Sequence, residues 1–76
     1  MEHYTEHRFV ICIRNDEYPA SLETRKIYEA IPDQEAEKHH QLRIIDESGE
    51  DYFYPEEYFV HIELSKAAEE ALVKAA

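Results

Sequence analysis

Apolar and polar residues alternate at every second position over several short stretches of the chain, and this spacing is typical of β-strands. The clearest alternation runs from residue 58 to residue 64. It divides a predicted strand into two faces, with Tyr58, Val60, Ile62 and Leu64 on one and Phe59, His61 and Glu63 on the other. Because the first set is entirely apolar, we expect it to face the core.

Four further strands are predicted, at residues 8–14, 25–31, 41–46 and 51–54. The first contains five apolar residues in succession, which indicates a strand covered on both faces. In the second, Tyr28 and Ala30 share a face, and in the third, Leu42 and Ile44 do so. The fourth is short and aromatic. The pattern therefore predicts a small protein made mainly of β-strands.

Turn and cap residues separate these strands. Gly49 is the only glycine, and it stands where a hairpin turn needs a residue at positive φ. Pro55 begins a segment that is long enough for one 3₁₀ turn only. The long loop after the first strand contains Leu22, which we expect to point inward and anchor it.

Two helical segments are predicted. Asp33 is a favourable N-cap for a short helical turn at residues 34–38. Ser65 is expected to cap a helix from residue 66 to about residue 75, whose composition favours helix. A helix of that length is marginal alone, so it should pack on the sheet or on a partner.

Size and composition limit the class of protein. The chain has 76 residues, which predicts one domain with a small core. Its apolar content of 43% is enough for folding. One cysteine cannot form an internal disulfide, no apolar run is long enough to span a membrane, and residues 1–7 show no signal-peptide pattern. We therefore expect a cytoplasmic protein with no membrane contact and a flexible N-terminus.

The formal net charge is −10, and a surface of this sign repels phosphate backbones. Electrostatic repulsion therefore disfavours nucleic-acid binding. It stays open as an alternative, because five basic side chains could gather on one side of the molecule: Arg8, Arg14, Arg25, Lys26 and Arg43. A basic protein partner suits the charge better.

The five short strands, the long first loop, the tight hairpin and the segment Pro55-Glu56-Glu57-Tyr58-Phe59-Val60 resemble an SH3-like barrel. Residues 9–64 also resemble a group of short bacterial proteins of no assigned function. The matching pieces are residues 20–23, 25–28 and 31–33, together with the run Ile45-Asp46-Glu47-Ser48-Gly49-Glu50-Asp51-Tyr52. The resemblance implies this fold and a bacterial origin, and it implies no activity.

True SH3 domains bind Pro-rich peptides in a groove that requires a tryptophan and a Tyr-rich first strand. This chain has no tryptophan, and residues 9–13 lack the Tyr-rich motif. Recognition of Pro-rich peptides is therefore not expected, since a shared fold does not carry function with it.

The aromatic residues around the third proline are the main candidate site. They are Tyr52, Phe53, Tyr54, Tyr58 and Phe59. Tyrosine suits protein interfaces, and Phe53 and Tyr54 are the best candidates for exposure. The alternative is that the cluster packs inside the sheet. The predicted interaction surface comprises Phe53, Tyr54, Pro55, Tyr58, Glu56 and Glu57.

The remaining reactive residues point to no chemistry. The acidic run from Asp46 to Glu63 contains no Lys or Arg, but it lacks the ligand order of a calcium loop, and we expect it to form a solvated hairpin. Cys12 is expected to be buried and inert. The histidines show no zinc-binding spacing: His3, His7, His39, His40 and His61.

The sequence thus predicts a single domain of residues 1–76, with an SH3-like barrel at 8–64 and a C-terminal helix at 65–76. We expect no enzyme activity, catalytic residue, cofactor or metal. The expected function is protein interaction, with an unknown protein partner or by self-association. A metal-binding or small-molecule-binding protein is the first alternative, and a nucleic-acid-associated barrel is the second.

Overall fold

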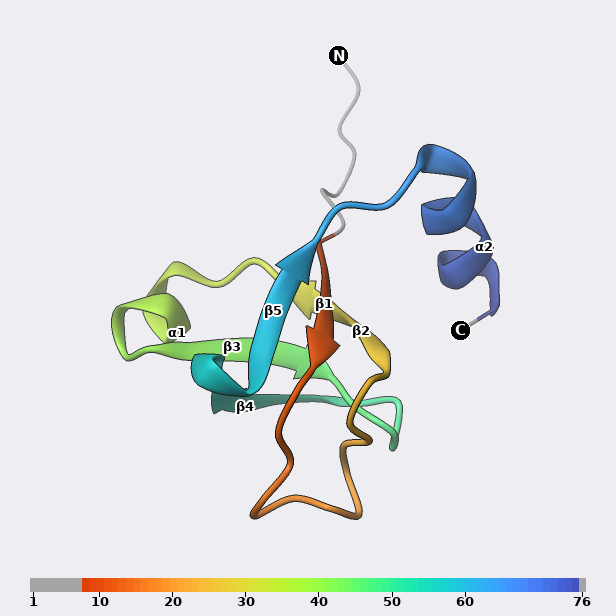
Figure 1. The fold of residues 1–76 in the computed structure, drawn as a ribbon. Coiled ribbons are helices and arrows are strands. Elements are labelled where there is room, and N and C mark those ends of the chain that lie inside the picture. Colours follow the sequence, from red (N-terminus) through yellow and green to blue (C-terminus); the bar gives the residue numbers. More distant parts are fainter. Residues whose placement is uncertain (1–7, 76) are drawn as a thin grey trace.

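The computed structural model describes residues 8–75, and the side chains of residues 8–72 (Figure 1). The predicted flexible segment, residues 1–7, lies outside this range. The elements in chain order are β1 (Arg8–Cys12), β2 (Ile27–Ile31), α1 (Gln34–Lys38), β3 (Gln41–Ile45), β4 (Asp51–Pro55), η1 (Glu56–Tyr58), β5 (Phe59–Ile62) and α2 (Lys66–Ala75).

The strands form one antiparallel sheet in the order β4-β3-β2-β1-β5. Figure 1 shows β1 and β5 running across the direction of β3 and β4, with β2 connecting the two halves. The prediction of five strands is confirmed. The sheet is open, because β4 and β5 stand at its two ends and do not pair with each other within the described residues.

The core lies on the concave side of this bent sheet. Leu22, Ile44, Val10 and Cys12 are its largest fully buried side chains, and the expectation that Leu22 anchors the first loop is confirmed. Tyr28, Ala30, Leu42, Tyr54, Tyr58 and Phe59 join the same cluster. The inward positions of β2 and β3 follow the predicted alternation, since Tyr28, Ala30, Leu42 and Ile44 are all buried.

The predicted facing of the last strand is wrong. Val60 is 47% exposed, whereas Tyr58 and Phe59 are both buried although they are adjacent in the chain. The cause is η1, which turns Tyr58 inward from a 3₁₀ helix before β5 begins its own alternation at Phe59. The first strand also ends earlier than predicted, at Cys12, and Ile13 is 50% exposed.

Both predicted helix caps are confirmed. The Asp33 carboxylate accepts a hydrogen bond from the backbone N–H of Ala36 at 3.0 Å. The Ser65 hydroxyl accepts one from the N–H of Ala68 at 3.1 Å. Helix α2 stands beside the sheet, where Leu72 lines a hollow together with Phe9 and Ile27. No helix in the described part of the chain has the length and apolar character needed to cross a membrane.

The hairpin between β3 and β4 turns at the predicted glycine. Gly49 has φ +87°, and its N–H donates to the carbonyl of Asp46 at 2.9 Å. A Cβ atom at this position would meet no atom within 4 Å, so a substitution is opposed by the backbone conformation alone.

We expect Gly49→Val to lower the free energy of unfolding by on the order of 1–2 kcal/mol, because β-branched residues are disfavoured at positive φ. Gly49→Asn is the matched control and should cost less, since asparagine tolerates the left-handed region. Urea unfolding of the three proteins measures both values. Equal stability of the valine variant and the wild type would contradict the positive-φ turn.

Candidate interaction surface

The structure divides the predicted interaction surface into buried and exposed residues. Phe53 is 51% exposed, and Glu56 and Glu57 are exposed as well. Tyr54 and Tyr58 are only 3% and 4% exposed, so the expectation that Tyr54 is exposed is wrong, and neither ring is open to a partner. Pro55 is half-buried between these groups.

Tyr54 and Tyr58 belong to an aromatic cluster in the core. Tyr54 alternates inward from β4, and its ring meets that of Tyr18 edge-on, with the centroids 4.9 Å apart. The rings of Tyr18 and Tyr58 lie 6.1 Å apart. Tyr18 thereby joins the first loop to β4 and η1, and the alternative that the aromatics pack inside the sheet holds for this part of the cluster.

Asp46 is the residue that the sequence reasoning missed. Although we expected the acidic run to be solvated, Asp46 is only 6% exposed. It accepts hydrogen bonds from the backbone N–H of Ser48, from the Ser48 hydroxyl at 2.6 Å, and from the Tyr54 hydroxyl at 2.6 Å. The pair Asp46 and Ser48 is the pattern of an Asx turn, which could have shown that this carboxylate belongs to the turn.

The hydrogen bonds also set the titration of these groups. Burial raises the pKa of Asp46, but the bonds from Ser48 and Tyr54 together outweigh it, so the pKa lies below its usual value. Burial, followed by the bond to the Asp46 carboxylate, raises the pKa of Tyr54 to about 12. Ionised Asp46 and neutral Tyr54 therefore stabilise each other at neutral pH.

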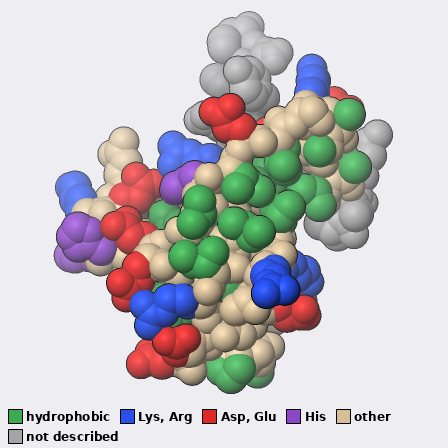
Figure 2. Space-filling model, viewed as in Figure 1, with side chains coloured by type: hydrophobic (Ala, Val, Ile, Leu, Met, Phe, Trp, Pro, Cys, Tyr) green, Lys and Arg blue, Asp and Glu red, His purple; other side chains and the backbone are tan. Residues whose placement is uncertain are grey.

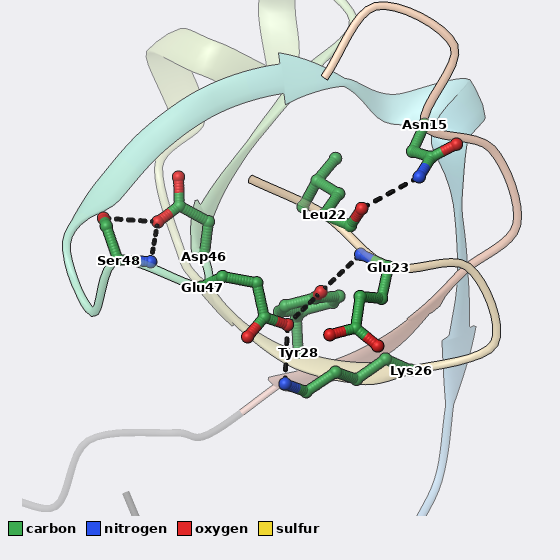
Figure 3. Close-up of polar contacts among 8 residues, drawn as sticks. All are labelled: Asn15, Leu22, Glu23, Lys26, Tyr28, Asp46, Glu47 and Ser48. Atoms are coloured by element: carbon green, nitrogen blue, oxygen red, sulfur yellow. Dashed lines mark hydrogen bonds and ion pairs between the residues drawn. The ribbon is translucent and has the colours of Figure 1, made fainter. Parts of the chain in front are cut away.

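The next carboxylate, Glu47, connects the hairpin to β2 (Figure 3). It accepts a hydrogen bond from the Tyr28 hydroxyl and pairs with the Lys26 ammonium, each at 2.5 Å. The Tyr28 hydroxyl in turn accepts the backbone N–H of Glu23 at 2.7 Å. The bonds from Lys26 and Tyr28 lower the pKa of Glu47. This network joins the hairpin, the first loop and β2 through contacts within the chain.

Strand β4 is open to solvent at its first three residues. Asp51, Tyr52 and Phe53 are all exposed, with Tyr52 at 52% and Phe53 at 51%. Successive residues of a strand point to opposite faces, so the exposure of three in a row means that both faces are open here. Because β4 is also an end strand of the sheet, two large aromatic side chains stand on an edge with which no other strand of the described residues pairs.

Acidic side chains lie at both ends of this edge. Glu50 precedes the strand, and Glu56 and Glu57 follow it, all of them exposed. Glu56 lies 3.3 Å from His40, and Glu57 lies 3.8 Å from Arg14. Asp51, within the strand, accepts a 2.7 Å hydrogen bond from Arg43, and this bond lowers its pKa.

A second group of apolar side chains lies on the convex face. Figure 2 shows hydrophobic side chains gathered over β5, β1 and the neighbouring α2. Val60 and Ile13 are about half exposed, and Ile11, Ile27 and Ile62 are partly buried. The strand register places Ile11 beside both Val60 and Ile27. This face therefore offers an apolar surface separate from the β4 edge.

Cys12, His39 and His40 make structural contacts within the described part of the chain. Cys12 is fully buried as expected, its thiol donates to the Arg14 carbonyl at 3.1 Å, and burial raises its pKa. His39 pairs with Glu35 and His40 with Glu56 on the surface. Among the described residues no group of three or more His, Cys, Asp or Glu side chains is arranged to hold a metal ion. His3 and His7 lie outside the described residues.

A scan against protein-family models, a search of curated proteins and a search of solved structures each found no match to this chain.

We expect Asp46→Asn to lower the free energy of unfolding by about 1–3 kcal/mol at pH 7, because the amide replaces a buried anion that accepts three hydrogen bonds. The pKa of Asp46 is depressed by folding, so its contribution is present above the ordinary aspartate pKa of about 3.9 and is lost as the pH falls through the folded value.

The difference between variant and wild type should therefore shrink on acidification, which urea unfolding at pH 7 and at low pH measures. Asp16→Asn is the control: it changes an exposed carboxylate paired with Arg14 and should alter stability by less than about 0.5 kcal/mol. If the cost of Asp46→Asn is the same at every pH, the ionised form is not what stabilises the hairpin.

Proposed function

We propose that this chain is a non-catalytic protein-interaction module built on an SH3-like barrel. The fold part of the proposal is supported by the long first loop, the tight β3–β4 hairpin and the 3₁₀ turn η1 directly before the last strand. The pairing of β1 with both β2 and β5 agrees with such a barrel. The resemblance to short bacterial proteins and the single cysteine lead us to place the module in the bacterial cytoplasm.

The observation that carries the functional part is the exposure of Tyr52 and Phe53 on the end strand β4. The buried core contains five other aromatic residues, namely Phe9, Tyr28, Tyr54, Tyr58 and Phe59, and the two exposed rings lie outside it. Burial of the exposed half of one such side chain by a partner is worth about 1 kcal/mol. Aromatic residues are enriched at protein interfaces for this reason.

The distribution of charge favours protein over nucleic acid as the partner. Four of the five basic residues on which nucleic-acid binding would depend are paired with carboxylates: Arg8 with Glu37, Arg14 with Asp16, Lys26 with Glu47, and Arg43 with Asp51. The surplus charge is acidic. A nucleic acid would meet neutralised basic groups and net repulsion, whereas a basic protein would be attracted.

Phe53→Ser tests the proposal. We expect it to leave the stability within about 0.5 kcal/mol of the wild type, since the side chain is half exposed, and to abolish capture of a partner by the immobilised protein. Val60→Ser is the matched control, because Val60 is 47% exposed on the separate convex face. Capture is measured by mass spectrometry of the retained proteins from the cells that produce this chain.

The same variants are compared by sedimentation to detect self-association. The proposal is upheld if Phe53→Ser alone removes a retained protein or a dimer. It is overturned if the wild type retains no protein and sediments as a monomer. Loss of binding in Val60→Ser alone would show that the partner binds the convex face and not the β4 edge.

A further inference from the structure

We infer that the open edge of β4 receives an extended basic segment of a partner protein, which pairs with it as a sixth strand. The inference rests on the proposed function and specifies it: the partner chemistry is a strand-forming segment that carries Lys or Arg around a short apolar centre. Recognition of this kind combines main-chain hydrogen bonds at a sheet edge with contacts of alternate side chains.

The hydrogen-bond pattern of the hairpin determines which backbone groups face the edge. At one end of the β3–β4 ladder, the N–H of Asp46 donates to the carbonyl of Glu50 at 3.1 Å. At the other end, the N–H of Glu56 donates to the carbonyl of His40 at 2.9 Å. The register between them is regular, from Gln41 opposite Pro55 to Ile45 opposite Asp51.

In an antiparallel pair, hydrogen-bonded and non-hydrogen-bonded positions alternate. Glu50 and Glu56 are hydrogen-bonded positions, so every second residue between them is hydrogen-bonded to β3 as well. Tyr52 and Tyr54 therefore direct their N–H and C=O groups toward β3. Asp51, Phe53 and Pro55 therefore direct theirs away from β3, to the open edge. Phe53 offers both a donor and an acceptor there, while Pro55 offers an acceptor only. The edge thus presents a short row of main-chain groups centred on Phe53.

Pro55 and Asp51 give this edge part of the protection that end strands usually have, but its centre at Phe53 carries none. Its register contains no bulge, and no Lys lies within it. The other end strand is less open, because the N–H of Phe59 already donates to the carbonyl of Glu56. The β4 edge is therefore the better template for an added strand.

The charges beside the edge select the occupant. An added strand that spans β4 would pass Glu50 at one end and Glu56 and Glu57 at the other. Lys or Arg at those positions would pair with exposed carboxylates, and acidic residues would be repelled. A second copy of this chain suits the site less well, because each copy has a net charge of −10. Pairing of two copies about Phe53 would also set Glu50 of one opposite Glu56 of the other.

A capped synthetic peptide, Lys-Lys-Thr-Thr-Val-Val-Thr-Lys, is the probe. In antiparallel register it sets Lys opposite Glu57, Glu56 and Glu50, and the two Val opposite Phe53 and Tyr52. Titration into isotope-labelled protein, followed by amide NMR, should shift the Asp51 and Phe53 signals and slow hydrogen exchange at Phe53. Added salt should weaken the binding, because the charge pairs are exposed.

Two control peptides separate charge from strand pairing. The peptide with Glu in place of each Lys should bind at least about tenfold more weakly, as expected when several exposed ion pairs become repulsive. The peptide with Pro in place of the Val opposite Phe53 lacks the N–H that the pairing requires, and it should not bind. Equal binding of all three peptides overturns the inference.

Variants of the protein test the same dependence on charge and on main-chain pairing. The variant E50K/E56K changes exposed side chains only and should reverse the preference, so that it binds the acidic peptide better than the basic one. Phe53→Pro removes the outward N–H and should abolish binding of the basic peptide with little loss of stability. Tyr52→Pro removes a bond of the β3–β4 ladder and should be much less stable, which tests the alternation itself.

The outcomes separate this inference from the proposed function. If the basic peptide moves signals on the convex face around Val60, or moves none at millimolar concentration, strand addition at β4 is wrong. If Phe53→Ser removes the partner that the wild type retains, but the basic peptide does not shift the Asp51 and Phe53 signals, strand addition is wrong while the interaction module stands. If E50K/E56K does not reverse the peptide preference, the charge selection is wrong.

Discussion

The buried carboxylate of Asp46 is the interaction on which much of this small sheet depends. It connects the turn residue Ser48 to Tyr54, and Tyr54 in turn meets the first loop through the ring of Tyr18. One anion therefore joins the hairpin, the core and the longest loop. A chain of 76 residues has a small core, so the hydrophobic contribution to its stability is limited. Hydrogen bonds to a buried charge, which are stronger than neutral ones, add to that stability.

This arrangement explains why the aromatic residues are divided into two groups. Tyr54 must point inward to reach Asp46, and the alternation of β4 then directs Phe53 to the opposite side. Tyr52 shares the inward side with Tyr54, but it lies closer to the hairpin turn and is 52% exposed. The bond that orders the core thus accounts for the outward ring of Phe53, and the position of Tyr52 near the turn accounts for the second open ring.

The charged side chains also fall into two groups, those paired within the chain and those left exposed beside β4. Four basic side chains are paired with carboxylates of the same chain, and the acidic surplus includes residues at the two ends of β4. An exposed strand edge normally invites pairing with another copy, and like charge opposes that pairing. Under the proposed function, the acidic ends would oppose pairing of two copies and attract a basic segment.

Local signals in the sequence determined the strands, both helix caps and the glycine turn, because alternation, capping and positive φ depend on neighbouring residues only. The facing of Val60 and the burial of Asp46 and Tyr54 could not be predicted in this way. Those features depend on how η1 reorients the chain before β5, and on the position of β4 at one end of the sheet. Contacts between distant segments decide them, so only the tertiary structure separated the buried rings from those left open to a partner.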